Sequence, residues 1–148
     1  MRIVLDTNVL VSGLLSPFGP PGEIVRLVSS GLMSLCLDAR IVAEYHDVLA
    51  RPRFRFDGDA VADLLAYLES SGEMVASAPL PARLPDPDDE AFLEVALAGA
   101  ADCLVTGNLS HFPPPARAGV AVLSPAQLID RYRSSLAYRE TATDEGDR

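Results

Sequence analysis

Residues 1–10 read Met1-Arg2-Ile3-Val4-Leu5-Asp6-Thr7-Asn8-Val9-Leu10. The apolar run 3–5 is typical of a buried parallel strand, and an open α/β sheet holds its ligands at the carboxyl ends of such strands. Asp6 stands at that end, so its carboxylate is placed for chemistry. The same position also suits an Asx turn or the cap of a following helix. The rest of the chain has to decide between these interpretations.

Strand-like runs alternate with helical runs along the chain, which indicates βαβ units and an α/β fold with a mostly parallel sheet. Further strands are expected at 32–37, 103–106 and 120–123, and helices at 7–15, 23–30, 39–50, 59–71 and 87–98, with a last one from 125. The breaker-rich residues 17–22 are predicted to form a loop. Residues 1–138 are assigned to a single domain, and the polar, acidic residues 139–148 to a disordered tail.

Composition narrows the classes of protein. The chain has 148 residues, of which 49% are hydrophobic, so one domain can bury a sufficient core without disulfides. Cys36 and Cys103 lie in apolar runs and are predicted to be buried free thiols. The sequence shows no signal peptide and no stretch that resembles a membrane helix, so we expect a cytoplasmic protein with no membrane contact.

The charged residues also exclude classes of function. A net charge of −9 argues against a general nucleic-acid coat protein, but it is compatible with a nuclease whose carboxylates bind a metal ion, and it suits a basic protein partner. All 12 basic residues are arginine. P-loop NTPases and Schiff-base enzymes both need a lysine, so neither class fits.

Two further acids are candidates for the same site as Asp6. Glu44 lies at the margin of the apolar face of the helix 39–50, from which it can point along the edge of the sheet. It can equally be an ordinary surface glutamate. Asp89 shares a side with Phe92 and Leu93 and therefore faces inward, although an acid near a helix start also interacts with the helix dipole. An inward carboxylate needs a partner, and a metal ion is one such partner.

Polar residues after the strand 103–106 complete the candidate site. If this strand runs parallel to the first, Thr106 and Asn108 emerge at the same edge as Asp6, unless they form a plain turn. Residues 51–56 alternate arginines with aromatic rings, and Arg51 and Arg53 could bind phosphates of a nucleic acid. The alternative is an ordinary loop anchored by its phenylalanines. His46 and His111 are expected to be surface or structural residues, because neither has a partner at ligand spacing.

The candidate residues lie in four motifs, which occur along the chain in this order: Asp6-Thr7-Asn8, Glu44 in Glu44-Tyr45-x-x-Val48-Leu49, Asp86-Pro87-Asp88-Asp89-Glu90-Ala91-Phe92-Leu93, and Ala101-Asp102-Cys103-Leu104-Val105-Thr106-Gly107-Asn108. Together they resemble the PIN-domain family, and they are most similar to its toxin-type branch, the ribonucleases of bacterial and archaeal toxin–antitoxin pairs. The likeness spans residues 1 to about 130.

The resemblance implies an α/β/α sandwich with a central, mostly parallel sheet, and an acidic cluster that binds Mg²⁺ or Mn²⁺ for RNA cleavage. Asp6, Glu44 and Asp89 match the core acids, and Asn108 stands where many members carry a fourth aspartate. One-metal and two-metal operation therefore both stay open. In this interpretation Asp6 and Asp89 hold the main ion, Glu44 orients the attacking water, and Thr106 and Asn108 contact water or the scissile phosphate.

The family likeness also implies partners, namely an RNA substrate, a small antitoxin protein and a second copy of the chain in a homodimer. Two alternatives stay open. One is a PIN-type nuclease that acts in RNA maturation or on structured DNA. The other is a non-catalytic interaction module, which the asparagine at position 108 and the acidic balance would suit.

Overall fold

The computed structural model describes residues 1–146 and confirms the expected α/β class. Its sheet has five strands in the order β3-β2-β1-β4-β5, and every neighbouring pair is parallel. The strands are β1 (Arg2–Leu5), β2 (Ser34–Leu37), β3 (Glu73–Met74), β4 (Cys103–Val105) and β5 (Val122–Leu123). β1 is therefore the central strand, and its carboxyl end lies between those of β2 and β4.

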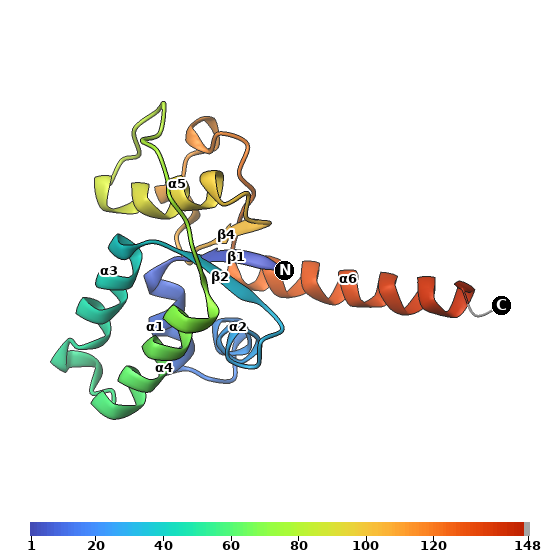
Figure 1. The fold of residues 1–148 in the computed structure, drawn as a ribbon, viewed down its shortest axis with the longest axis horizontal. Helices are drawn as coiled ribbons and strands as arrows, with labels where there is room; N and C mark the ends of the chain where they lie inside the picture. Colours follow the sequence, from blue (N-terminus) through green and yellow to red (C-terminus); the bar gives the residue numbers. More distant parts are fainter. Residues whose placement is uncertain (147–148) are drawn as a thin grey trace.

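Helices cover both faces of the sheet and complete an α/β/α sandwich. In Figure 1, α5 lies above the strands, and α1, α2 and α4 lie below them. The helices are α1 (Thr7–Leu15), α2 (Pro20–Ser29), α3 (Ala39–Leu49), α4 (Gly58–Ser71), α5 (Glu90–Ala98) and α6 (Pro125–Gly146). Short 3₁₀ turns occur at Pro52–Phe54, Pro87–Asp89, Leu109–His111 and Pro114–Ala116.

Helix starts follow the capping residues in the sequence. The Asp38 side chain accepts a hydrogen bond from the Ile41 backbone N–H at 3.0 Å, which satisfies a free donor in the first turn of α3. At the start of α6, Ser124 Oγ accepts from the Gln127 N–H at 3.2 Å, and Pro125 occupies the first helical position. Both helix starts are confirmed.

Two local predictions are wrong. The segment 17–22 is predicted to be a loop, but α2 begins at Pro20, because proline is tolerated in a first turn whose N–H groups have no helical acceptor. The strand β3 is absent from the sequence prediction. Its two residues, Glu73 and Met74, are both exposed and show no apolar pattern, so no periodicity marks them.

The register of the sheet determines which residues meet at its carboxyl edge. The strands β1 and β4 pair Ile3 with Cys103 and Leu5 with Val105. The next residue on each strand is polar, and Asp6 therefore lies beside Thr106. The apolar residues of both strands are fully buried, and Cys36 and Cys103 are buried free thiols, as predicted.

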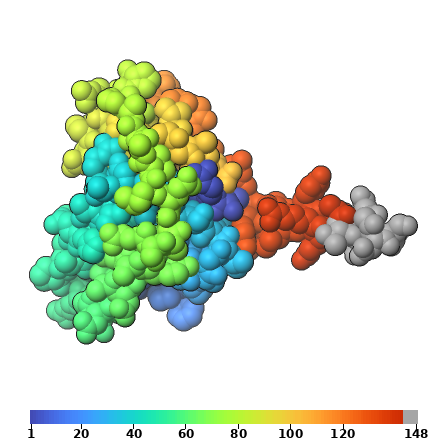
Figure 2. Space-filling view, in the orientation of Figure 1, coloured from blue at the N-terminus to red at the C-terminus, as the bar shows by residue number. Residues whose placement is uncertain are grey.

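The last helix extends past the expected domain boundary. α6 continues to Gly146, whereas the sequence predicts a disordered tail from residue 139, because no proline or glycine interrupts the helix before that glycine. Residues 147–148 of the predicted tail lie outside the described part of the chain. Leu128 and Ile129 near the start of α6 are buried, whereas Figure 2 shows the C-terminal part of the helix projecting from the body of the molecule. Among residues 1–146, no helix is both long and apolar enough to cross a lipid bilayer.

Candidate active site

Asp6 is the most buried acid of the candidate site, with 6% of its surface exposed. It occupies the cap position of α1, but its side chain makes no capping hydrogen bond. The carboxylate instead accepts from Thr106 Oγ1 at 2.8 Å and from Asn8 Nδ2 at 3.4 Å. Burial raises the pKa of Asp6, and the hydrogen bond from Thr106 acts in the opposite direction. The cap interpretation of Asp6 therefore does not account for its carboxylate.

Glu44 reaches the same edge of the sheet from α3. Its Oε2 accepts a short hydrogen bond from the Thr7 hydroxyl, so the residue after Asp6 holds it in place. The next residue of α3, Tyr45, is fully buried and donates its hydroxyl to the Leu5 carbonyl. This bond fixes α3 against the end of β1. Burial raises the pKa of Glu44, and the negative charge of Asp6 raises it further.

Asp89 ends the 3₁₀ turn that precedes α5, and its side chain is only 13% exposed. The prediction that it faces inward is confirmed. Its Oδ2 is buried and has no hydrogen-bond partner. His111 Nδ1 lies 3.2 Å from this oxygen, which is within the distance of an ion pair. Burial, with repulsion from Asp6 next in size, raises the pKa of Asp89 to about 6.

The rim residues Thr106 and Asn108 lie where the sequence places them. Thr106 is fully buried, and its Oγ1 accepts from the Asn108 backbone N–H at 3.0 Å. The Asn108 side chain contacts His111 Nε2 at 2.9 Å and accepts from Ser110 Oγ at 3.1 Å. Because an amide nitrogen can only donate, His111 Nε2 is the acceptor of this contact.

His111 is thus a link that sequence reasoning missed. It joins Asn108 on one side to Asp89 on the other. Its position three residues after Asn108 on a single turn was the available signal. A search for metal ligands at short sequence spacing cannot find the contact between His111 and Asp89, because Asp89 lies on a separate segment of the chain.

The three acids are close enough for their charges to interact. The charges of Asp6 and Glu44 both raise the pKa of Asp89. However, no group of three or more acidic, histidine or cysteine side chains in the described residues is arranged to hold a metal ion. The arrangement is therefore an open group of acids and not a closed cage.

The arginine-rich segment lies beside this group. Arg51 pairs with Asp47 at 3.3 Å. Burial raises the pKa of Glu44, and the positive charge of Arg51 opposes that rise. The Arg53 guanidinium lies 4.8 Å from the centre of the Phe54 ring, and that ring stacks on Phe56. Both phenylalanines pack against the core, as the loop interpretation expects. The substrate contacts of Arg51 and Arg53 stay predictions.

A family model for the PIN domain matches residues 2–110, which is well over half of the chain. The chain belongs to the PIN-domain family. No curated protein matches it. The matched range contains all four of the candidate residues Asp6, Glu44, Asp89 and Asn108.

PIN domains are generally nucleases, and those nucleases typically use divalent metal ions. Membership therefore indicates a nuclease-type function for this PIN domain. The oxygen-rich set formed by Asp6, Glu44, Asp89 and Asn108 is of the kind that Mg²⁺ and Mn²⁺ prefer.

Proposed function

We propose that this PIN domain is a metal-dependent endoribonuclease and the toxin of a type II toxin–antitoxin pair. One observation carries the nuclease proposal: Asp89 Oδ2 is buried without a hydrogen-bond partner, and its pKa is raised to about 6 beside two other acids. A buried carboxylate oxygen of this kind requires a cation or a proton. At neutral pH a cation is the better partner.

The donor set suits a divalent ion. Asp6 and Asp89 would hold it, directly or through water, because Mg²⁺ retains several waters and needs few protein ligands. An open group of acids is compatible with this mode of binding. Once bound, the ion would neutralise charge on the phosphodiester and help to activate a water molecule.

The chain's own residues divide the remaining tasks. Thr7 occupies Oε2 of Glu44, so Oε1 is left to accept a proton from the attacking water. The raised pKa of Glu44 brings it closer to the pH at which a general base works well. Thr106 donates a hydrogen bond to Asp6 and so holds it in one orientation. Asn108 contacts His111, and His111 in turn lies beside Asp89.

Two observations support RNA as the substrate and a role as a toxin. The motif pattern resembles the toxin-type branch, and a net charge of −9 suits a basic antitoxin. Arg51 lies near Glu44 and, with Arg53, would bind substrate phosphates. A homodimer and cytoplasmic action belong to the same proposal.

The first experiment is cleavage of a fluorescent single-stranded RNA by the purified protein. We expect cleavage with Mg²⁺ or Mn²⁺, none in EDTA, and none from Asp6→Asn or Glu44→Gln. Asp63→Asn, which changes an exposed aspartate of α4, is the matched control and should cleave normally. Cleavage that persists in EDTA or in Asp6→Asn would contradict the proposal.

Two further measurements separate the alternatives. If the acids bind an ion, Mg²⁺ should raise the melting temperature of the wild type and not that of Asp89→Asn, because a ligand of the folded state stabilises it. This readout does not depend on turnover. Growth arrest on expression, relieved by Asp6→Asn, would support the toxin role. A nuclease of RNA maturation or structured DNA should not arrest growth, and an interaction module should not cleave RNA.

A further inference from the structure

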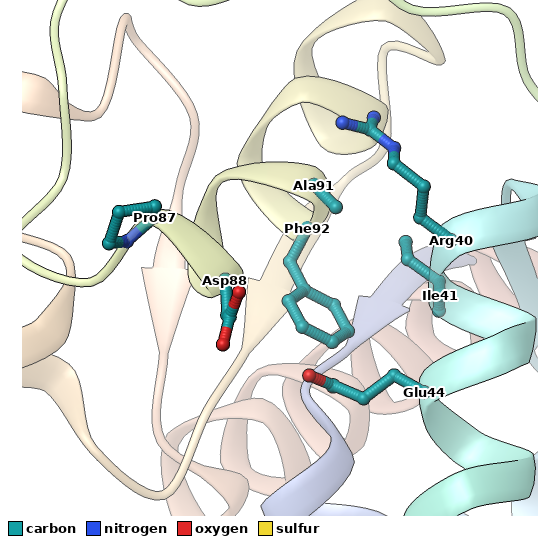
Figure 3. Close-up of a pocket in the computed structure, with 7 residues that line it drawn as sticks. All are labelled: Arg40, Ile41, Glu44, Pro87, Asp88, Ala91 and Phe92. Atoms are coloured by element: carbon teal, nitrogen blue, oxygen red, sulfur yellow. The ribbon is translucent and has the colours of Figure 1, made fainter.

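A pocket of about 380 Å³ opens directly beside the acids. Figure 3 shows α3 supplying Arg40, Ile41 and Glu44 to its wall. Asp88 approaches from the 3₁₀ turn before α5, and Phe92 approaches from α5 itself. Pockets of roughly 300–1,000 Å³ hold small molecules or single groups of larger ones. Since Glu44 belongs both to this pocket and to the candidate active site, a nucleotide bound here would have its phosphodiester next to the acids.

The charges of the pocket select against a phosphate. The only cation in its lining, Arg40, is already bound to Asp38 at 2.7 Å, to Glu94 at 2.8 Å and to Ser77 at 3.1 Å. The other charged side chains are the carboxylates of Glu44 and Asp88, and the negative charge of Asp88 raises the pKa of Glu44. The pocket therefore presents hydrogen-bond acceptors to its ligand.

The remaining lining is apolar. Ile41 and Phe92 are buried at the wall, and Ala91 is half-buried beside them. A ligand that fits is flat and uncharged, with apolar faces and N–H donors at one edge. A nucleobase with an amino group has these properties, and single-stranded RNA can present one because its bases are unstacked.

We infer that this pocket is a guanine subsite for the nucleotide beside the scissile phosphate, an inference that rests on the proposed nuclease function. Guanine presents two parallel N–H donors, N1–H and the 2-amino group, which match the two oxygens of one carboxylate. Asp88 is exposed, and its carboxylate accepts no hydrogen bond from any residue in the range 1–146. Uracil has one such donor, and inosine lacks the 2-amino group.

A binding experiment tests the subsite without any turnover. The dinucleotides GpU, IpU and UpU are titrated into the metal-free protein while the methyl signals of Ile41 and Ala91 are followed by NMR. We expect GpU to shift both signals and to bind about tenfold more tightly than IpU, because one hydrogen bond to a charged group is lost. In Asp88→Asn this difference should disappear, whereas Asp63→Asn should retain it.

Cleavage gives the second readout. Uridine-rich oligonucleotides with one central guanosine, inosine or uridine should be cut fastest at guanosine, and Asp88→Asn should reduce that preference while cleavage itself continues. Equal binding of GpU and IpU, shifts at other methyl groups, or an unchanged preference in Asp88→Asn would overturn the subsite. If the protein binds GpU more tightly than IpU but cleaves no RNA, the guanine subsite is supported and only the nuclease function is contradicted.

Discussion

Replacing Asp89 by asparagine should make the metal-free protein more stable at neutral pH. Asparagine has the shape of aspartate and no charge, so the change removes the burial cost and the repulsion from Asp6 and Glu44. Those effects, together with repulsion from Asp86, raise the pKa of Asp89 from 3.8 to about 6. One pKa unit corresponds to about 1.4 kcal/mol, so the whole shift corresponds to about 3 kcal/mol. Because solvent reaches part of the carboxyl, we expect a gain of about 1–2 kcal/mol.

The sign of the pH dependence follows from the same shift. The pKa of Asp89 is higher in the folded protein than in the unfolded chain, so the folded protein takes up this proton first as the pH falls. The stability contributed by the protonated group is fully present below about pH 4 and is lost as the pH rises through about 6. Asp89→Asn lacks this titration, and its advantage should therefore shrink on acidification.

The assay is urea unfolding in EDTA, followed by far-ultraviolet circular dichroism at pH 7.5 and 4.5. Wild type, Asp89→Asn and the exposed control Asp63→Asn are compared at both pH values. A variant that is less stable than wild type at pH 7.5, or one whose advantage is the same at both pH values, would refute the electrostatic account of this site. The control should match wild type throughout.

Three other substitutions each test one residue of the candidate active site or one contact that supports it. Thr106→Val removes the hydrogen bond to Asp6 and should raise the pKa of that acid further. The acid limb of the pH–rate profile for RNA cleavage should therefore move to higher pH, and an unmoved limb would contradict this. Tyr45→Phe leaves the Leu5 carbonyl without its donor and should cost about 1–3 kcal/mol in urea unfolding, together with some cleavage activity; unchanged stability would show that the bond contributes nothing. Asn108→Asp should preserve or raise cleavage if the position only tunes an ion site, and a large loss in the same assay would assign Asn108 another role.

Most of the fold follows from local signals in the sequence. The apolar run Ile3 to Leu5 predicts a buried strand, and Asp38 predicts the start of a helix. Both predictions need only a few neighbouring residues, because strand burial and helix capping are local effects. The inward face of Asp89 also follows from helical spacing. These predictions needed no knowledge of the tertiary structure.

The remaining features depend on contacts between distant segments. Spacing along one helix cannot reveal that Tyr45 bonds to Leu5, because the bond joins residues 40 positions apart. The contact of His111 with Asp89 is of the same kind. The acids named from the sequence are near enough for their charges to interact, but the side chains that contact them could not be predicted.

The central place of β1 in the sheet affects when the acids can assemble during translation. Asp6 leaves the ribosome before its hydrogen-bond donor Thr106, which follows 100 positions later. At a synthesis rate of about 5–20 residues per second, this interval lasts roughly 5–20 seconds. During that time one edge of β1 has no β4 to pair with, and the acids lack the strand that orients Asp6. The acids therefore cannot take up the arrangement seen in the folded domain until the segment that contains Thr106 has been made.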